Sequence, residues 1–234
     1  MLSSMKVPLP VTCPACKNKF ALDVRGSDLP EYTKCPKCGA QSRNQWPLGN
    51  AVTILLMERA RQELADGDVT IAILLSSMAV EGEMAFLFFK WKSIDAKKLP
   101  HAVTEADQKE WDVAWKGFSS FRAQLDAVSK LLTHSAFDKF ALESKAWLLP
   151  KLDGFDPATG IKQHFQNHFY RTRTRVVHYG EVDFQKQDGD RCFSLAWVLL
   201  KLFHAMDRKA CELLDDGQRT PNPQSAGASG VAGD

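Results

Sequence analysis

The sequence predicts a mainly α fold: a helical bundle of five or six helices that follows a small N-terminal β unit. Two observations lead to this prediction. From residue 49 onward, apolar side chains recur at the helical spacings of three and four, in segments bounded by residues typical of helix ends. Before residue 49, the chain carries two short β-like pieces, "KFALDV" and "EYTKC", together with four clustered cysteines.

The bundle is predicted to begin with a tight antiparallel helix pair. Asn50 can cap a first helix, "AVTILLMERARQELA", which stops at "DGD". Asp68 can then cap the long second helix, "VTIAILLSSMAVEGEMAFLFFKWK". Thr104, with Asp107 three residues later, is a start of the capping-box type for a third helix, "EADQKEWDVAWKGFSSFRAQLDAVSKLL", bent near Gly117.

Three further helices complete the predicted bundle. The segment "SAFDKFALESKAWLL" ends at Pro150, and Asp156 with Pro157 marks the start of the next helix. That helix, "IKQHFQNHFYRTRTRVVHY", ends at Gly180. After a polar turn around "KQDGD", Asp190 caps the last helix, "RCFSLAWVLLKLFHAMDRKACELL". We therefore divide the chain into a leader (1–10), a cysteine unit (11–46), a helical bundle (49–215) and a small, polar, disordered tail (216–234).

The composition is that of an ordinary soluble globular protein, with 44% hydrophobic and 25% charged residues. A formal charge of +2 neither demands nor excludes a nucleic-acid partner, so any electrostatic argument depends on local clusters. No apolar run approaches the roughly 20 residues of a membrane span, and cysteines and prolines interrupt the N-terminus before a signal-peptide core can form. We expect a cytoplasmic protein with no membrane partner.

The clustered cysteines form two C-x-x-C pairs, Cys13 with Cys16 and Cys35 with Cys38. Four thiolates of this spacing can close tetrahedrally around Zn²⁺ at ~2.3 Å, and Gly39 eases the tight turn of the second pair. Because no ligand position is left open to water, a structural zinc is the better interpretation, and a redox dithiol is the alternative. The pattern C-P-x-C…C-P-x-C-G resembles the zinc-ribbon families, which implies a few short antiparallel strands around the metal.

The partner of this ribbon is less defined. Residues 11–45 contain six Lys and Arg and three acidic residues, and four thiolates with one Zn²⁺ remove two positive charges. The small remainder argues against a ribbon that holds nucleic acid by electrostatics alone. Contact with RNA, on one side, and docking on another protein or within the chain, on the other, stay equal alternatives.

The stretch "RTRTRVVHYG" carries the strongest catalytic signal of the helical part. Arg173 and Arg171 precede His178 by five and seven residues, just before the helix end at Gly180. Here residues 49 to about 215 resemble the HEPN superfamily, all-α domains whose ribonuclease members use an R-x(4–6)-H motif near the start of the closing helical segment. The chain departs from many members at Thr174, where they have Asn or another polar group.

The chemistry explains why such a pair is useful. RNA can be cut without a metal if a base removes the 2′-OH proton and a fixed cation stabilises the charge that builds on the phosphorane oxygens. On this interpretation His178 is the base or acid and Arg173 the phosphate clamp. Arg171 is the alternative clamp, because it lies about two helical turns from His178 and shares its face, whereas Arg173 shares it only if the helix bends or ends early.

A basic stripe is predicted along the same helix. Side chains at spacings of four and three place His164, His168 and Arg175 on the face of Arg171 and His178, and no acidic residue occurs between 161 and 178. Such a ridge is suited to phosphate contacts, and the alternative is a solvated edge beside a core. The adjacent apolar positions are Ile161, Phe165, Phe169 and Val176.

Two glutamates interrupt the apolar second helix. Glu81 is the candidate for orienting an arginine or histidine of the motif, in keeping with the acidic residue that HEPN-like domains often carry at about this place. The spacing of Glu81 and Glu83 predicts that one of the two faces solvent.

Two functional hypotheses follow from these features. The first is a metal-independent HEPN-type endoribonuclease with a structural zinc ribbon, of the kind that bacterial defence and toxin systems use. It acts on RNA as a homodimer, because one histidine supplies one proton carrier and in-line cleavage needs two. The apolar positions beside the stripe are the expected twofold contact. The second hypothesis is a non-catalytic zinc-ribbon adaptor that binds nucleic acid or protein. The sequence identifies neither an RNA target nor a neutralising or regulatory protein.

Overall fold

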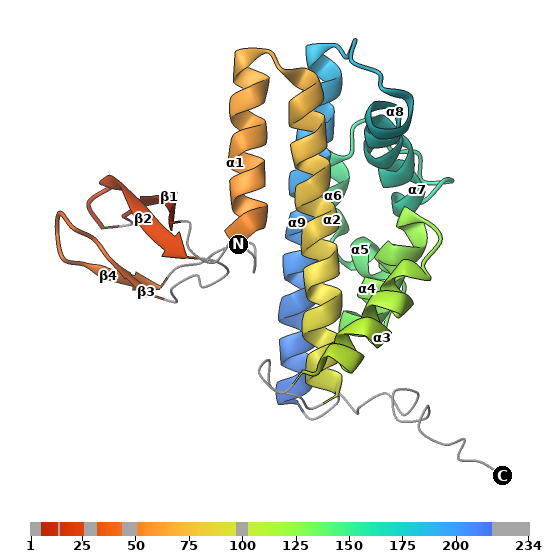
Figure 1. Ribbon diagram of the computed structural model, residues 1–234, viewed down its shortest axis with the longest axis horizontal. Helices are drawn as coiled ribbons and strands as arrows, with labels where there is room; N and C mark the ends of the chain where they lie inside the picture. The colour runs from red at the N-terminus through yellow and green to blue at the C-terminus, as the bar shows by residue number, and fades with distance from the viewer. Residues whose placement is uncertain (1–5, 14, 26–31, 44–50, 97–102, 217–234) are drawn as a thin grey trace. The chain divides into compact units, whose positions relative to one another are not determined.

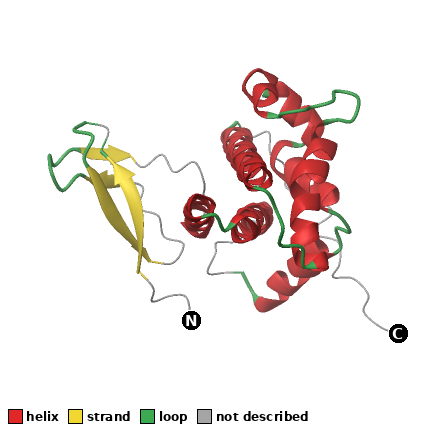
Figure 2. Cartoon of the chain, turned by 90° about the horizontal axis from the view of Figure 1, so that it is seen from above, coloured by secondary structure: helices red, strands yellow, loops and turns green. Residues whose placement is uncertain are grey.

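A computed structural model describes residues 6–13, 15–25, 32–43, 51–96 and 103–216 of the chain. The predicted mainly α fold is confirmed. Every described strand lies before residue 44, and the described residues from Ala51 onward form helices and their connections (Figure 2). The expected Asn50 cap and all but the first residue of the expected tail lie outside the described residues.

The strands form two antiparallel hairpins, each closed by one C-x-x-C pair. Strand β1 (Lys6–Thr12) pairs with β2 (Lys19–Arg25), and β3 (Tyr32–Lys34) pairs with β4 (Gln41–Arg43). Because β1 begins at Lys6, the first hairpin takes in half of the segment that the sequence assigned to a leader. Pro8 and Pro10 concealed this strand, but prolines two residues apart can both turn their nitrogens to the open edge of a two-stranded sheet.

The chain divides into two compact units, which we describe separately. The first comprises Met1–Glu83 and Asn167–His204, and the second comprises Met84–Gln166 and Ala205–Asp234.

In the first unit, α1 (Ala51–Asp66) and the start of α2 (Val69–Asp95) form the expected antiparallel pair (Figure 1). The turn between them packs against the start of α9 (Lys186–Asp215). A Cβ atom on Gly189 of α9 would lie 2.6 Å from the Leu64 side chain and 2.8 Å from the Val69 side chain, so any larger residue would force these side chains to shift. The last helix thus begins before the Asp190 cap that the sequence predicted. The backbone N–H of Gln185 donates to Asp188 at 3.1 Å, which makes "KQDGD" the first turn of the helix rather than a loop.

In the second unit, the expected long third helix is two helices, α3 (Glu105–Lys116) and α4 (Phe121–Thr133). The Thr104–Asp107 capping box is present, as predicted. Gly117 caps the C-terminus of α3, and the side chain of Ser120 accepts the backbone N–H of Ala123 to start α4. Because α3 has its own C-terminal cap and α4 its own N-terminal cap, the chain breaks into two helices where the sequence predicted a bend.

The remaining helices of this unit are short. They are α5 (Phe137–Glu143), α6 (Lys145–Leu148) with a 3₁₀ turn to Lys151, and α7 (Ile161–Phe165). Asp156 does not start the next helix: it accepts the N–H of Ala158 and closes a turn. The first turn of α7 is instead capped from α5, because Asp138 accepts the backbone N–H of Lys162 at 2.7 Å.

The backbone between Ile161 and Gly180 is not one regular α-helix. One π-helical turn, Gln166–Tyr170, separates α7 from α8 (Arg171–Tyr179). Gly180 ends α8 in the left-handed conformation, with φ of 63°, as predicted. A π turn inserts an additional residue into a helix and shifts the side chains before it relative to those after it.

Helix α2 is long and apolar enough to cross a membrane by length and composition, contrary to the expectation from the sequence. However, 56% of its most apolar 18-residue window is buried within the protein, as in the core helix of a soluble protein. The helix also carries two glutamates that bond to neighbouring helices in the first unit.

Candidate functional site

The four cysteines of the two hairpins converge as the sequence predicted. All four Sγ atoms lie within 4.8 Å of one another, and the Cys13–Cys38 and Cys16–Cys35 Sγ pairs are each 3.7 Å apart. A disulfide requires about 2.05 Å, whereas sulfurs 2.3 Å from a tetrahedral ion are separated by ~3.8 Å. The four thiols can therefore hold a metal ion.

The two hairpin turns repeat one backbone arrangement. In each, the N–H group of the residue four positions after the first cysteine donates to that cysteine's carbonyl: Lys17 to Cys13 at 2.9 Å, and Gly39 to Cys35 at 3.0 Å. Both donor residues are left-handed, with φ of 59° for Lys17 and 70° for Gly39. Sequence reasoning noted Gly39 and missed Lys17, although its offset from the C-x-x-C pair is the same.

Backbone N–H groups prepare two of the thiols to ionise. The N–H of Cys38 holds the pKa of Cys35 at about 6, and the N–H of Cys16 lowers the pKa of Cys13. The N–H of Ala40 also acts to lower the pKa of Cys38, but the neighbouring cysteine side chains raise it to about 12. Thiolates this close need a shared cation before all four can ionise.

The arginine–histidine motif meets Glu81 across two helices of the first unit. The guanidinium of Arg173 on α8 contacts the Glu81 carboxylate on α2 twice, with Nε–Oε1 at 3.0 Å and Nη2–Oε2 at 3.3 Å. Its remaining nitrogen, Nη1, lies 3.5 Å from Nε2 of His178. The Arg173 side chain is 20% exposed, while His178 lies open to solvent at the end of the helix.

This geometry shows how Arg173 reaches His178 although the two residues are five positions apart and lie on different faces of the helix. Arg173 and His178 occupy different faces of α8, but the long arginine side chain brings its Nη1 to the histidine ring while Glu81 holds the other two nitrogens. The Tyr170 ring lies 5.6 Å from the guanidinium carbon and gives it a further neighbour, which the sequence did not reveal. Glu81 therefore lies where an orienting carboxylate is needed, and its role in any reaction stays a prediction.

Neither glutamate of α2 simply faces solvent, as we had expected of one. Glu83 is buried and accepts a hydrogen bond from Thr53 of α1 at 2.9 Å, while Glu81 reaches α8. Two residues apart on a helix, the carboxylates point to different neighbours.

The side chain that follows Arg173, Thr174, is bonded to the backbone of its own helix. Thr174 donates its hydroxyl to the Tyr170 carbonyl at 3.0 Å, a local bond common for threonine in helices. It lends no donor to the Arg173–His178 pair in this arrangement.

The basic stripe is not assembled as predicted. His164 is only 3% exposed, and its ring lies 5.8 Å from Phe155 and 6.2 Å from Phe165, so it is not available for a phosphate. The π turn separates it in register from α8, and His168 lies within that turn, half-buried. The adjacent apolar positions are core rather than a dimer contact: Ile161, Phe165, Phe169 and Val176 are all buried.

The two other arginines of α8 differ in their surroundings. Arg175 is paired with Glu181 through two nitrogens, and its guanidinium carbon lies 4.8 Å from the Phe184 ring. The hydrogen bond to Glu181 raises the pKa of Arg175, so its charge is already compensated. Arg171 is exposed and has no hydrogen-bond or ion-pair partner in the part of the chain that the structure describes.

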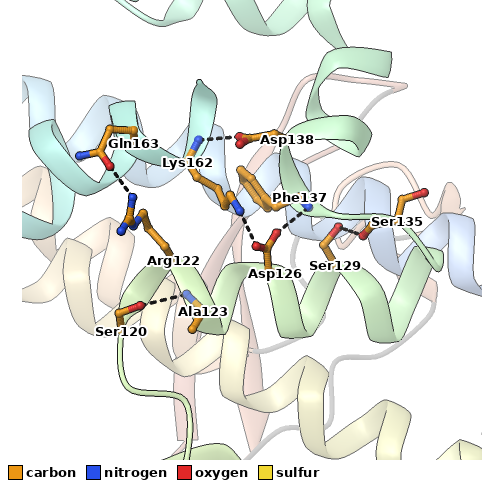
Figure 3. A network of polar contacts seen from close by, with 10 residues as sticks. All are labelled: Ser120, Arg122, Ala123, Asp126, Ser129, Ser135, Phe137, Asp138, Lys162 and Gln163. Carbon is orange, nitrogen blue, oxygen red and sulfur yellow. Dashed lines mark hydrogen bonds and ion pairs between the residues drawn. The ribbon is translucent and has the colours of Figure 1, made fainter. Parts of the chain in front are cut away.

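A second polar cluster, in the second unit, was not foreseen. Asp126 of α4 accepts the backbone N–H of Phe137 at 2.9 Å and an ion pair from Lys162 of α7 (Figure 3). Arg122 donates to Gln163 at 2.6 Å beside it. Residues of this cluster line an open pocket of about 440 Å³. Because its members are distant in sequence and follow no known spacing, the sequence carried no signal for them.

Comparisons of the chain with known protein families, with curated proteins and with solved structures found no match.

Proposed function

We propose that the protein is a metal-independent endoribonuclease of HEPN type whose N-terminal ribbon is closed by a structural zinc ion. The observation that carries the proposal is the arrangement of Arg173, with two nitrogens on Glu81 and the third 3.5 Å from the ring of exposed His178. A cation whose orientation is held by a carboxylate, beside an imidazole that can accept or donate a proton, is what metal-free cleavage of RNA requires.

In this mechanism the His178 imidazole transfers the proton at the 2′-oxygen or at the leaving oxygen. Arg173 directs its Nη1 edge, which is not bonded to Glu81, to the non-bridging phosphate oxygens and stabilises the charge that builds on them. Glu81 is a positioning residue, since it holds the guanidinium rather than the substrate. Arg171 is a second phosphate contact on the same helix.

The residues around Arg173 and His178 favour a reaction that needs no divalent metal. Among the described residues, the cysteines are the one cluster of three or more His, Cys, Asp or Glu side chains able to share an ion. Mg²⁺ prefers carboxylate oxygens, and Glu81 already has both of its oxygens on Arg173.

The cysteine site fits a zinc ion. Four convergent sulfurs at tetrahedral separations, two of them buried, match an all-thiolate structural site. Cys13, Cys16, Cys35 and Cys38 would hold the ion, which joins the two hairpins.

The protein acts as a homodimer in this proposal, but through a different surface from the one first expected. One face of helix α2 is apolar and open to solvent. Its residues lie about one helical turn apart: Ile71 and Met78 are exposed, and Leu74 and Leu75 are partly exposed. The face continues to Glu81, so a twofold contact there would bring a second Arg173–His178 pair near the first and supply the second proton carrier.

Cleavage of a fluorescent RNA in EDTA tests the proposal. His178→Asn is expected to lower the rate by about 10²–10⁴-fold, the usual contribution of general acid–base catalysis. The matched control is His134→Asn, which alters an exposed histidine in the second unit where asparagine suits the left-handed backbone. Equal activity of His178→Asn and His134→Asn would sink the proposal.

The zinc assignment is tested by elemental analysis of protein purified without added metal. One zinc per chain is expected, and Cys35→Ser together with Cys38→Ser is expected to remove it. A folded ribbon free of metal would refute the assignment.

A second candidate, a non-catalytic adaptor for RNA or protein, is favoured by two observations. The charges of Arg173 and Arg175 are compensated by Glu81 and Glu181, and the Thr174 hydroxyl is bonded to the backbone. RNA binding without cleavage would support this candidate. Under either proposal we place the protein in the cytoplasm, and under the first in a defence or toxin system, whose neutralising or regulatory protein the sequence does not identify.

A further inference from the structure

The end of α8 carries an aromatic side chain that the described residues leave largely uncovered. Tyr179, the last residue of the helix and the neighbour of His178, is 78% exposed. Val182, three residues later, is 67% exposed, and Val177 is exposed as well. These three side chains are close in sequence, and an exposed aromatic ring beside exposed apolar side chains is a candidate contact surface.

The backbone that presents this ring is held firmly. The N–H of Gly180 donates to Val176 at 3.1 Å, and Thr70 of α2 donates to the Val182 carbonyl at 3.0 Å. Between these bonds, Arg175 ties the helix to Glu181. The ring therefore stands on a fixed support, which reduces the conformational entropy lost when a ligand stacks on it.

A cation lies farther along the same helix. Arg171, which is without a partner in the described residues, precedes His178 by seven residues, about 10 Å along the axis. The helix thus offers a flat ring and a proton carrier at one end and an uncompensated charge at the other. Nucleotides combine the matching features, since each has a base with a π face and a phosphate.

We propose that Tyr179 stacks on an unpaired nucleobase of a single-stranded RNA whose backbone runs along α8 toward Arg171. The inference rests on the proposed function, of which it specifies the substrate class. A base within an A-form duplex is already covered on both faces by its neighbours, so a ring at a helix end can stack only on a base that is splayed out. The site therefore selects loops, bulges and single strands.

Binding of a fluorescein-labelled single-stranded oligoribonucleotide with 2′-O-methyl groups, which cannot be cleaved, tests the inference in EDTA. Tyr179→Ala is expected to weaken binding by about 5- to 150-fold, as for loss of one stacked base, while Tyr179→Phe keeps wild-type affinity. Arg171→Gln is expected to weaken binding and to reduce the salt dependence by about one phosphate contact. Trp147→Ala, at an exposed tryptophan of the second unit, is the matched control.

Unchanged affinity in Tyr179→Ala, or equal affinity for the same sequence in a duplex, would overturn the inference. So would a change in dimer mass without a change in RNA affinity, because the ring would then belong to a protein contact. Since no bond is cut in this assay, its outcome is separate from that of the cleavage test: loss of binding in Tyr179→Ala supports the inference even for an inactive protein.

Discussion

Two ion pairs between helices differ in what surrounds them. In the second unit, one oxygen of Asp126 pairs with the Lys162 ammonium and the other accepts the backbone N–H of Phe137 (Figure 3). The backbone N–H of Lys162 donates to Asp138. In the first unit, Arg173 has two nitrogens on Glu81 and turns the third to the exposed ring of His178.

Under the proposed function, this difference separates a structural cluster from a catalytic one. Asp126 accepts the Phe137 N–H at the start of α5 and pairs with the Lys162 ammonium, while Asp138 accepts the Lys162 N–H at the start of α7. The cluster therefore fixes the connection of α4, α5 and α7. Arg173 instead has two nitrogens on Glu81 and the third beside the side chain of His178, which is exposed to solvent. A polar network that ends on backbone stabilises the fold, whereas one that ends on an exposed imidazole can act on a ligand.

The largest expected effect is on cleavage in Arg173→Lys. A lysine keeps the charge but has no planar fork, so it cannot hold Glu81 and face a phosphate in one orientation. We expect the cleavage rate to fall by about 10²–10³-fold, as on losing one electrostatic donor. The midpoint of urea unfolding should change little, because the pair is partly exposed.

Lys162→Met is the matched variant in the other cluster, since it removes the charge and keeps an unbranched side chain. Cleavage by the folded protein should be unchanged. A loss as large as that of Arg173→Lys would erase the distinction between the two clusters.

The next effect in size is the stability of Asp126→Asn. The side-chain oxygen of asparagine can still accept the Phe137 N–H. Its amide NH₂ would then face the Lys162 ammonium, and because both groups are donors, the largely buried charge of Lys162 is left unpaired. We expect the free energy of unfolding to fall by about 1–3 kcal/mol in urea titrations. Glu81→Gln, measured alongside, should lose less stability and more cleavage activity, and the reverse order would contradict our assignment.

The same comparison shows what could be predicted from the sequence. The helical segments as a whole, the capping box at Thr104, the end of α8 at Gly180 and the cluster of four cysteines were predicted, although the predicted third helix is two helices. The Arg173–Glu81 contact was within reach because a glutamate in an apolar helix needs a partner.

What could not be predicted depends on contacts between distant segments. Asp138, not Asp156, caps α7, because tertiary packing brings α5 to the helix start. The π turn at Gln166–Tyr170 has no sequence signature. The stripe from His164 to His178 was predicted for a regular α-helix, and the π turn changes which residues share a face.

A smaller effect is expected in the pH dependence of stability. Burial raises the pKa of Asp126, but the hydrogen bonds from Lys162 and the Phe137 N–H outweigh it and lower the pKa from its ordinary 3.8. A carboxyl whose pKa is lower in the folded state stabilises the fold above the unfolded pKa, and this contribution is lost as the pH falls through the folded value. The stability difference between wild type and Asp126→Asn should therefore be constant from about pH 5 to 7 and shrink below about pH 4. A difference that grows on acidification would show that the ion pair is not its source.

The smallest effect on stability is expected for Glu181→Gln. This variant removes the exposed Arg175–Glu181 ion pair, which should stabilise the fold less than either of the two ion pairs compared above. Arg175 and Glu181 lie at the surface, where solvent and salt screen the pair, and Arg175 keeps its contact with Phe184 in the variant. No change in the urea midpoint is expected. Removing the carboxylate nevertheless releases one positive charge on α8, so the single-stranded oligonucleotide should bind a few-fold more tightly at low salt, with a steeper salt dependence. Weaker binding in Glu181→Gln would instead mean that Glu181 orients Arg175, and that this pair, like Glu81 and Arg173, is part of the RNA-contacting surface.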